Sequence, residues 1–233
     1  MAERVLTFKR GCKDGFPVFL GYFTTALAFG LLTRTSGFTF IEGVLTSVTN
    51  FAGSGQFLML NLYNAGSFLL EIVISVFLIN SRYLFMSSSL RPHLENNSFF
   101  ALLFCGFGCT DEVFAISALK SRSLPFSYMA GLILTSYLGW VSGTATGFLA
   151  GSFLPPIVQS ASVITIYAMF SSLMGAEVEK NIKALVVFFV SASLNTLFIL
   201  CLRISTGLSF TLSMLISTIA AVFLYDDEEV LDE

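Results

Sequence analysis

Long apolar stretches separated by short polar segments run through the whole chain. A helix needs about 20 mainly apolar residues to cross a bilayer, and several stretches reach or approach that length. The pattern therefore predicts an all-α, polytopic helical membrane protein with seven or eight transmembrane spans, some of them broken by glycine. The predicted spans cover residues 16–33, 39–63, 66–90, 99–119, 125–153, 159–175, 184–202 and 207–225.

The stretch 39–63 is long enough to cross a membrane, but its middle is polar and rich in glycine. The residues clustered there are Asn50, Gly53, Ser54, Gly55 and Gln56. Glycines that loosen a helix free backbone groups at membrane depth, where protein, water or a ligand must bind them. A discontinuous helix at a midplane substrate site has this composition, so we favour a broken helix. The alternative is a continuous helix whose glycines allow close packing. A re-entrant segment would leave seven crossings.

The stretch 66–90 carries charged residues inside an apolar run. Glu71 and Arg82 are about three helical turns apart, so they face nearly the same direction, and Asn80 and Tyr83 flank the arginine. A charge in a bilayer costs at least about 2.5–3.5 kcal/mol, and such residues usually mark a cavity or pathway. We therefore predict that Arg82 lies at a functional site. The alternative is that Glu71 and Arg82 snorkel to opposite interfaces.

Two adjacent acids, Asp111 and Glu112, follow Gly106 and Gly108 within the stretch 99–119. Such a pair is either the amino-terminal cap of a helix after a break or a buried cation or proton site. A cap accounts for one acid and leaves the other unexplained. We therefore assign both acids to ion coupling.

Glycines recur at every fourth position in the stretch 125–153 and form one flat helix face. The usual role of such a face is close helix–helix contact, either within the chain or with another subunit. These glycines are Gly139, Gly143, Gly147 and Gly151.

Charged residues make up 12% of the chain, about half the proportion in soluble domains, and 55% of the residues are hydrophobic. We expect one transmembrane domain over 16–225, after a basic cytoplasmic lead-in at 1–15 and before an acidic, disordered tail at 226–233. With eight crossings, the bias of Lys and Arg places both termini in the cytoplasm. The cytoplasmic side then holds Arg4, Lys9, Arg10, Lys13, Lys120, Arg122, Lys180 and Lys183, and the opposite side holds Arg34, Arg82, Arg91 and Arg203.

The groups that membrane enzymes need are missing from the sequence. Asp111 is the only aspartate in a predicted span, and the only histidine, His93, follows Pro92 beyond the end of a span. No H-E-x-x-H motif and no nucleotide-binding G-x-x-x-x-G-K-[ST] motif occurs. We expect no enzymatic activity, cofactor, metal or nucleic-acid partner. A carrier for a small polar or zwitterionic solute would use the buried charges and the glycine breaks together. A channel and a non-transporting structural subunit are the alternatives.

Several motifs of the sequence resemble those of the AzlC family. They are "KDGFPVFLGYFTTALAFGLL" (13–32), "TSVTNFAGSGQF" (46–57), "INSRYLFMSSSLRPHL" (79–94) and "TDEVFA" (110–115). The resemblance covers about residues 10–205. It implies the large subunit of a bacterial branched-chain amino acid exporter in the cytoplasmic membrane, driven by an ion gradient and working with a small hydrophobic AzlD-like subunit. The sequence departs from the family at Tyr83, where histidine is frequent, in its acidic tail and in its richness in phenylalanine.

We predict a substrate site formed by the polar residues of 39–63 and 66–90. Arg82, helped by Asn80, is expected to neutralise the carboxylate of the amino acid, or to face an acid when the site is empty. The glycine-broken segment is expected to supply backbone donors or carbonyls beside it. The predicted substrate-binding residues are Arg82, Asn80, Tyr83, Asn50, Gly53, Ser54 and Gln56, and the predicted ion-coupling residues are Asp111 and Glu112.

Overall fold

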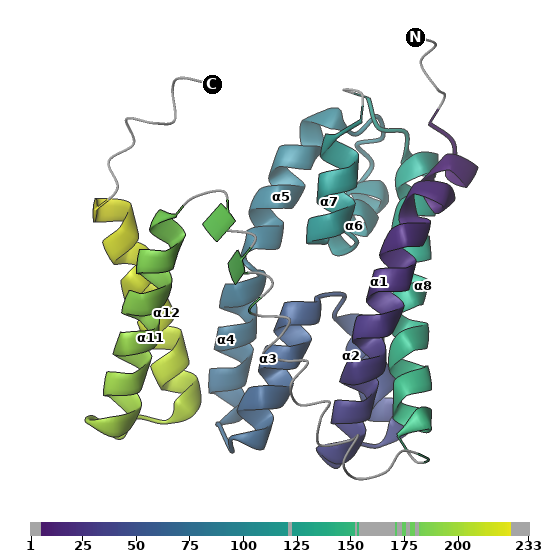
Figure 1. The fold of residues 1–233 in the computed structure, drawn as a ribbon. Coiled ribbons are helices and arrows are strands. Elements are labelled where there is room, and N and C mark those ends of the chain that lie inside the picture. Colours follow the sequence, from purple (N-terminus) through teal and green to yellow (C-terminus); the bar gives the residue numbers. More distant parts are fainter. Residues whose placement is uncertain are drawn as a thin grey trace.

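A computed structural model describes residues 6–120, 123–151, 153, 171, 174–175, 178–179 and 182–224. The described part is all-α, as predicted, apart from one isolated bridge between Leu94 and Leu124. Figure 1 shows the helices running mainly along one axis. They are α1 (Phe8–Thr35), α2 (Phe40–Thr49), α3 (Gly53–Asn64), α4 (Leu69–Asn80), α5 (Arg82–Leu90), the 3-10 helix η1 (Arg91–His93), α6 (Phe99–Phe107), α7 (Asp111–Ala118), α8 (Phe126–Ala150), α11 (Lys183–Leu200) and α12 (Thr206–Leu224).

Helices α1 and α8 lie side by side and form the scaffold of the fold (Figure 1). Their backbones touch through glycines. A Cβ atom on Gly147 would lie 2.0 Å from the carbonyl oxygen of Leu27, and one on Gly30 would lie 2.0 Å from that of Thr144. The glycine face predicted in 125–153 is therefore covered by α1 of the same chain. Of the two roles predicted for this face, the structure shows contact within the chain.

Helices α2 and α3 form a re-entrant hairpin, which we call the first hairpin. The amide of Asn64, at the end of α3, donates to the hydroxyl of Ser36, just before α2, at 2.8 Å. The rings of Phe38 and Tyr63 are also in contact, with centroids 4.9 Å apart. Both ends of the segment therefore lie at the end of the molecule where α1 stops, which we call the opposite face. The helix is broken, as predicted, and the segment re-enters.

Helices α6 and α7 form a second hairpin, from the other side. They are bent by 116° at the break that precedes Asp111. The backbone before α6 pairs with that after α7: the N–H of Leu124 donates to the carbonyl of His93 at 2.8 Å, and the N–H of Glu95 donates to that of Leu124 at 3.2 Å. Both ends lie where α1 begins, at the amino-terminal face. The prediction that 99–119 crosses the membrane was therefore wrong. Hydropathy shows that a segment is apolar and long enough to cross, but it does not show on which face the segment ends.

The structure does not show the predicted seven or eight spans. In the described part of the chain, three stretches are long and apolar enough to cross a membrane: Phe8–Thr35, Leu69–His93 and Lys183–Leu200. The bent pair α6–α7 would be a fourth only if it counted as one span. Of the segments counted in the prediction, 39–63 and 99–119 re-enter, and 159–175 lies outside the described residues, except for a few isolated positions.

The re-entrant hairpins also change the distribution of charge between the two faces. Arg91 was predicted on the opposite side, but it lies at the amino-terminal face because 39–63 does not cross. By the positive-inside rule, this more basic face is expected to be the cytoplasmic one. Among the described residues, the amino-terminal face holds Lys9, Arg10, Lys13, Arg91, Lys120 and Lys183, and the opposite face holds Arg34 and Arg203.

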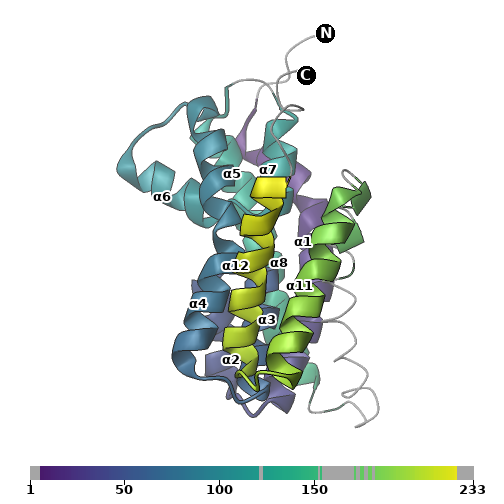
Figure 2. The same cartoon turned by 90° about the vertical axis from the view of Figure 1, so that its left-hand side faces the viewer.

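Helix α12 packs along α4 (Figure 2), on the side of the molecule away from α8 (Figure 1). The hydroxyls of Ser75 and Thr211 share a hydrogen bond of 2.7 Å between the two helices. The carboxylate of Glu71 accepts hydrogen bonds from the N–H of Phe68 and the hydroxyl of Ser205. Glu71 therefore caps the start of α4 and fastens α12 at the opposite face.

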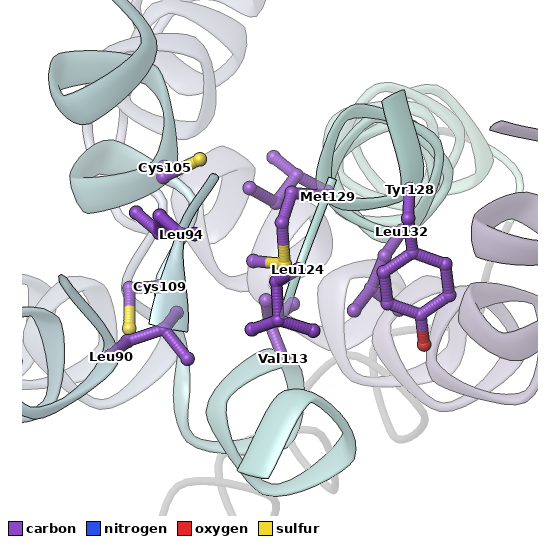
Figure 3. Packing of buried hydrophobic residues seen from close by; sticks show 10 residues of the cluster. Leu90, Leu94, Cys105, Cys109, Val113, Leu124, Tyr128, Met129 and Leu132 are labelled. Carbon is purple, nitrogen blue, oxygen red and sulfur yellow. The ribbon is translucent and has the colours of Figure 1, made fainter. Parts of the chain in front are cut away.

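The second hairpin packs against α8 and α5 through an apolar core (Figure 3). This packing fixes the position along α8 at which the chain breaks between α6 and α7. A Cβ atom on Gly108 would lie 2.3 Å from the Cγ2 atom of Ile133, so the break is pressed against α8. The buried members of this core are Leu90, Leu94, Cys105, Cys109, Val113, Leu124, Tyr128, Met129, Leu132 and Ile133.

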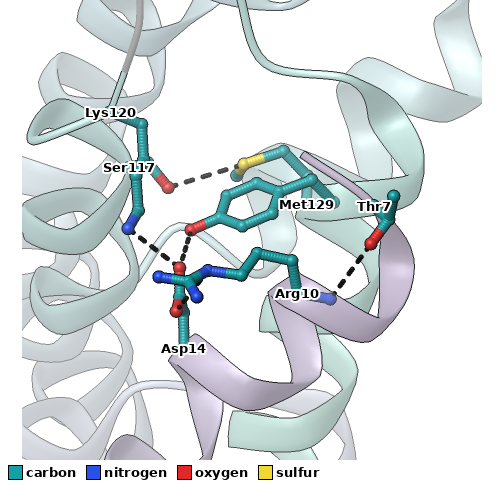
Figure 4. A network of polar contacts seen from close by, with 7 residues as sticks. Thr7, Arg10, Asp14, Ser117, Lys120 and Met129 are labelled. Carbon is teal, nitrogen blue, oxygen red and sulfur yellow. Dashed lines mark hydrogen bonds and ion pairs between the residues drawn. The ribbon is translucent and has the colours of Figure 1, made fainter. Parts of the chain in front are cut away.

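Asp14 ties α1 to the end of the second hairpin at the amino-terminal face (Figure 4). Its carboxylate pairs with Arg10 at 3.1 Å and with Lys120 at 2.8 Å, and it accepts a hydrogen bond of 3.0 Å from the hydroxyl of Tyr128. This cluster lies outside the cavity described below. Its contacts join α1, α8 and the segment after α7, so its role is to hold the scaffold together.

Candidate functional site

A cavity of about 740 Å³ lies between α1, α5 and the breaks of the two hairpins. Its volume falls within the usual range of small-molecule sites, about 300–1,000 Å³. The walls are mostly apolar, with a few polar groups that converge. Its polar side chains are those of Tyr22, Thr25, Ser54, Arg82, Tyr83, Thr110, Asp111 and Glu112, and its apolar walls include Val18, Phe51, Ala115, Ile116 and Trp140.

Arg82 is the first residue of α5, directly after Ser81, which follows the end of α4. Its Nη2 atom lies 3.0 Å from the Oδ2 atom of Asp111 and donates to the hydroxyl of Ser54 at 2.7 Å. The guanidinium also lies over the ring of Tyr83, 5.2 Å from its centroid. Arg82 therefore joins both hairpins, and the expected pairing with Asp111 is present.

The Arg82–Asp111 pair is open to the cavity. The two side chains are 35% and 38% exposed, so water screens the pair and its stability contribution is small. The Nε atom of Arg82 is buried without a hydrogen-bond partner in the described part of the chain. The Nη2 atom that pairs with Asp111 lies at the cavity instead, so an anion entering the cavity can compete with Asp111 for it.

Both hairpins point the amino terminus of a helix at the cavity. The first N–H groups of a helix have no partner inside it and carry partial positive charge. Helix α3 begins at Gly53 with no side-chain cap and no acid in its first turn. Helix α7 begins with Asp111 and Glu112. The cavity therefore has a donor-rich wall of Arg82 and the α3 terminus, and an acidic wall formed by α7.

Glu112 accepts a hydrogen bond from the hydroxyl of Tyr22 in α1. The ring of Tyr22 meets Trp140 and Phe51 edge to face, with centroids 5.5 and 5.6 Å away. Tyr22 is not among the predicted site residues, because nothing near it in an ordinary apolar span indicates a partner in α7. Only the packing of the second hairpin against α1 reveals this contact.

Gln56 and Asn50 lie behind the wall of the cavity and do not line it. Gln56 is fully buried, and its Nε2 atom donates to the carbonyls of Thr46 and Asn50 at 2.8 and 2.6 Å. Its Oε1 atom accepts from the indole of Trp140 at 3.0 Å and from the hydroxyl of Ser47 at 3.4 Å. The amide of Gln56 therefore closes the first hairpin, and the predicted contact with substrate stays a prediction.

Asn80 is close to the cavity but does not line it. It ends α4 and packs against Gly55, where an added Cβ atom would lie 2.7 Å from its Nδ2 atom. Of the predicted substrate-binding residues, the structure brings Arg82, Tyr83, Gly53 and Ser54 to the cavity, together with the two acids. Glu71 lies far from it, in the first turn of α4. No group of three or more metal-binding side chains occurs among the described residues.

Comparison with known proteins identifies relatives over the part of the chain that builds this cavity. A family model described as "AzlC protein" matches residues 17–154. An uncharacterized membrane protein of Archaeoglobus fulgidus is 41% identical over 176 residues, which are 72% of this chain and 74% of the relative. The inner membrane protein YgaZ of Escherichia coli is 32% identical over 183 residues, 75% of each chain.

A more distant relative is the branched-chain amino acid transport protein AzlC of Bacillus subtilis. It is 27% identical over 152 residues, 63% of this chain and 59% of the relative. No solved structure matches the chain. The residues matched by the family model run from the cavity-lining part of α1 to just beyond the end of α8, so they include both hairpins.

Proposed function

The chain belongs to the AzlC protein family, and we propose that it is a secondary transporter that exports branched-chain or similar hydrophobic amino acids across the cytoplasmic membrane. It is a multi-pass membrane protein and a homologue of an inner-membrane protein. The observation that carries the proposal is the screened Arg82–Asp111 pair in a largely apolar cavity. Such a cavity offers separate partners for the carboxylate, the ammonium and the side chain of an amino acid.

The carboxylate of the solute takes the place of Asp111 beside Arg82. Arginine suits this exchange because its planar fork binds a carboxylate through two hydrogen bonds. Ser54 and the free N–H groups at the start of α3 add donors on the same wall. The solute carboxylate therefore meets a preformed group of donors, and Asp111 is released.

The ammonium group binds Asp111 at the start of α7, after the solute carboxylate has displaced this acid from Arg82. The aliphatic side chain contacts the apolar wall, where Val18, Ala115 and Ile116 gather from α1 and α7. An apolar wall favours Leu, Ile and Val over polar amino acids, because a polar side chain would lose its hydrogen bonds to water there.

An ion gradient drives export, and the two acids of α7 supply the coupling site. The sequence contains no G-x-x-x-x-G-K-[ST] motif that would indicate ATP as the energy source. We also propose that the transporter works with a small hydrophobic AzlD-like subunit. This part rests on the family resemblance, because the glycine face of α8 is occupied by α1.

Counterflow of labelled leucine in proteoliposomes tests the proposal directly. The purified chain is reconstituted with and without the small subunit, and vesicles are loaded with unlabelled leucine, lysine or no amino acid. We expect transient accumulation of label only in leucine-loaded vesicles, and full activity only when both subunits are present. A purely structural subunit would give no solute-specific flux in any combination. Full counterflow by the chain alone would contradict the two-subunit part.

A further inference from the structure

The two adjacent acids of the cavity hold different partners on different helices. Asp111 faces Arg82 of α5, at 3.0 Å. Glu112 instead accepts a hydrogen bond from Tyr22 of α1. Successive residues of an α-helix point about 100° apart, because the helix has 3.6 residues per turn. The two carboxylates are therefore separated in direction although they are neighbours in sequence.

Glu112 is the acid whose protonation breaks no ion pair. Within the described part of the chain, Glu112 forms no ion pair, whereas Asp111 pairs with Arg82. A phenol hydroxyl can both donate and accept. When Glu112 is ionised, Tyr22 donates to it; when Glu112 is protonated, its own O–H can donate to the oxygen of Tyr22. The contact between α1 and α7 can thus exist in both protonation states.

The surroundings of Glu112 come from three helices. Tyr22 of α1 bonds to it, and Thr110 and Asp111 precede it at the start of α7. From α5, Arg82 and Tyr83 line the same cavity, with Arg82 directed at Asp111. Arg82 therefore pairs with Asp111, and Glu112 has the neutral hydroxyl of Tyr22 as its partner.

We infer that Glu112 carries the coupled proton and that Tyr22 is a positioning residue, which holds the Glu112 carboxylate against α1. Asp111 instead responds to the solute, because the solute displaces it from Arg82. The inference rests on the proposed function and divides the roles of its acid pair. One proton adds to the Glu112 carboxylate from water on one side of the membrane and returns to water on the other. Nothing is oxidised or reduced. The edge-to-face contacts of Tyr22 with Trp140 and Phe51 connect this proton site to the first hairpin.

Two transport assays on one variant separate this inference from the proposed function. Counterflow needs an intact solute site but no net proton movement, whereas leucine accumulation driven by a pH gradient needs both. For Glu112→Gln, reconstituted at equal amounts, we expect counterflow close to wild type and loss of gradient-driven accumulation. Gradient-driven accumulation at the wild-type level would overturn the inference. Loss of both activities would also overturn it, because Glu112 would then belong to the solute site. Absence of counterflow in the wild type would reject the proposed function instead.

The Tyr22→Phe variant tests the positioning role with a readout that a purely structural residue would not change. The hydroxyl of Tyr22 is the hydrogen-bond partner of the Glu112 carboxylate, so its removal should change the pH profile of gradient-driven transport. Tyr137→Phe is the matched control, since its hydroxyl donates to the carbonyl of Val48 and does not line the cavity. An unchanged profile for Tyr22→Phe, or an equal shift in both variants, would overturn the role of Tyr22.

Discussion

The two hairpins enter from opposite faces and end at the same cavity, but they are held by different kinds of interaction. The first hairpin is closed by neutral hydrogen bonds around Gln56, which is fully buried. The second contributes Asp111 and Glu112, whose bonds to Arg82 and Tyr22 lie at the cavity. Neutral buried bonds do not respond to a charged solute or a proton, whereas the contacts of the two acids do.

This difference indicates a division of labour between the hairpins. The first hairpin keeps its shape and presents the start of α3 to the solute. The second hairpin is fastened to α5 and α1 by contacts that a carboxylate or a proton can change. A ligand can shift a conformational equilibrium only through such differential contacts. We therefore expect substitutions in the first hairpin to lower the stability of the protein, and substitutions at the contacts of the second hairpin to impair transport.

The largest expected effect comes from unlocking the first hairpin with Gln56→Leu. The change leaves the indole of Trp140 and the carbonyl of Asn50 without the partner that Gln56 provides, and each such buried group costs about 1–3 kcal/mol. We expect little folded protein in the membrane and a clear drop in melting temperature of what remains. Asn61→Leu, at an exposed position of the same helix, is the control and should keep wild-type abundance. Normal stability of Gln56→Leu would contradict the claim that the hydrogen bonds of Gln56 hold the first hairpin together.

The next effect concerns function without loss of the fold. Arg82→Lys keeps the charge but loses the planar fork, and a charge-assisted hydrogen bond contributes about 1.5–3 kcal/mol. We expect a decrease in leucine counterflow of about tenfold or more at near-normal abundance. Arg91→Lys, exposed at the amino-terminal face, serves as control. If Arg82→Lys transported like wild type, Arg82 would not bind the solute and the second hairpin would lose its proposed role.

A smaller effect on stability shows how closely each hairpin packs against its neighbours. In Gly108→Ala the new methyl group would lie 2.3 Å from Ile133, and overpacking of this kind costs about 1–3 kcal/mol. In Gly55→Ala it would meet the amide end of Asn80, which can move more easily. We expect thermal melting to drop more for Gly108→Ala, with partial rescue by Ile133→Ala in the double variant. Equal destabilisation without rescue would show that the contact with α8 does not seat the second hairpin.

The sequence predicted the elements of the fold better than their connections. Apolar length and the glycine cluster near Gly53 correctly indicated helices and a break, because these are local properties. The return of 99–119 to its starting face was not predicted, since the hydrogen bonds between His93, Glu95 and Leu124 join residues distant in sequence. The same hydropathy fits a span and a hairpin.

The candidate site shows the same limit. Because burying a charge is costly, Arg82 was predicted to face an acid, and the structure shows it paired with Asp111. Polarity alone could not separate Gln56, whose amide is used inside the first hairpin, from Ser54, which lines the cavity. Tyr22 was not predicted because its partner is in another helix. Tertiary packing decides which polar side chains face the cavity.

The central claim, that the amino acid binds in the cavity between the hairpins with its carboxylate on Arg82, is tested most directly by solute protection of a cysteine at position 21. Gly21 lines the cavity, and a Cβ atom there meets nothing within 4 Å, so Gly21→Cys should fold normally. Asn97→Cys, exposed before α6, is the control. Both are made in a chain whose native cysteines are replaced by alanine: Cys12, Cys105, Cys109 and Cys201.

The rate of modification by a charged thiol reagent is measured with and without saturating leucine. We expect leucine to slow modification at position 21 but not at position 97, and we expect Arg82→Gln to remove the protection. Equal rates at position 21 with and without leucine, in a protein that still exchanges leucine, would contradict the claim.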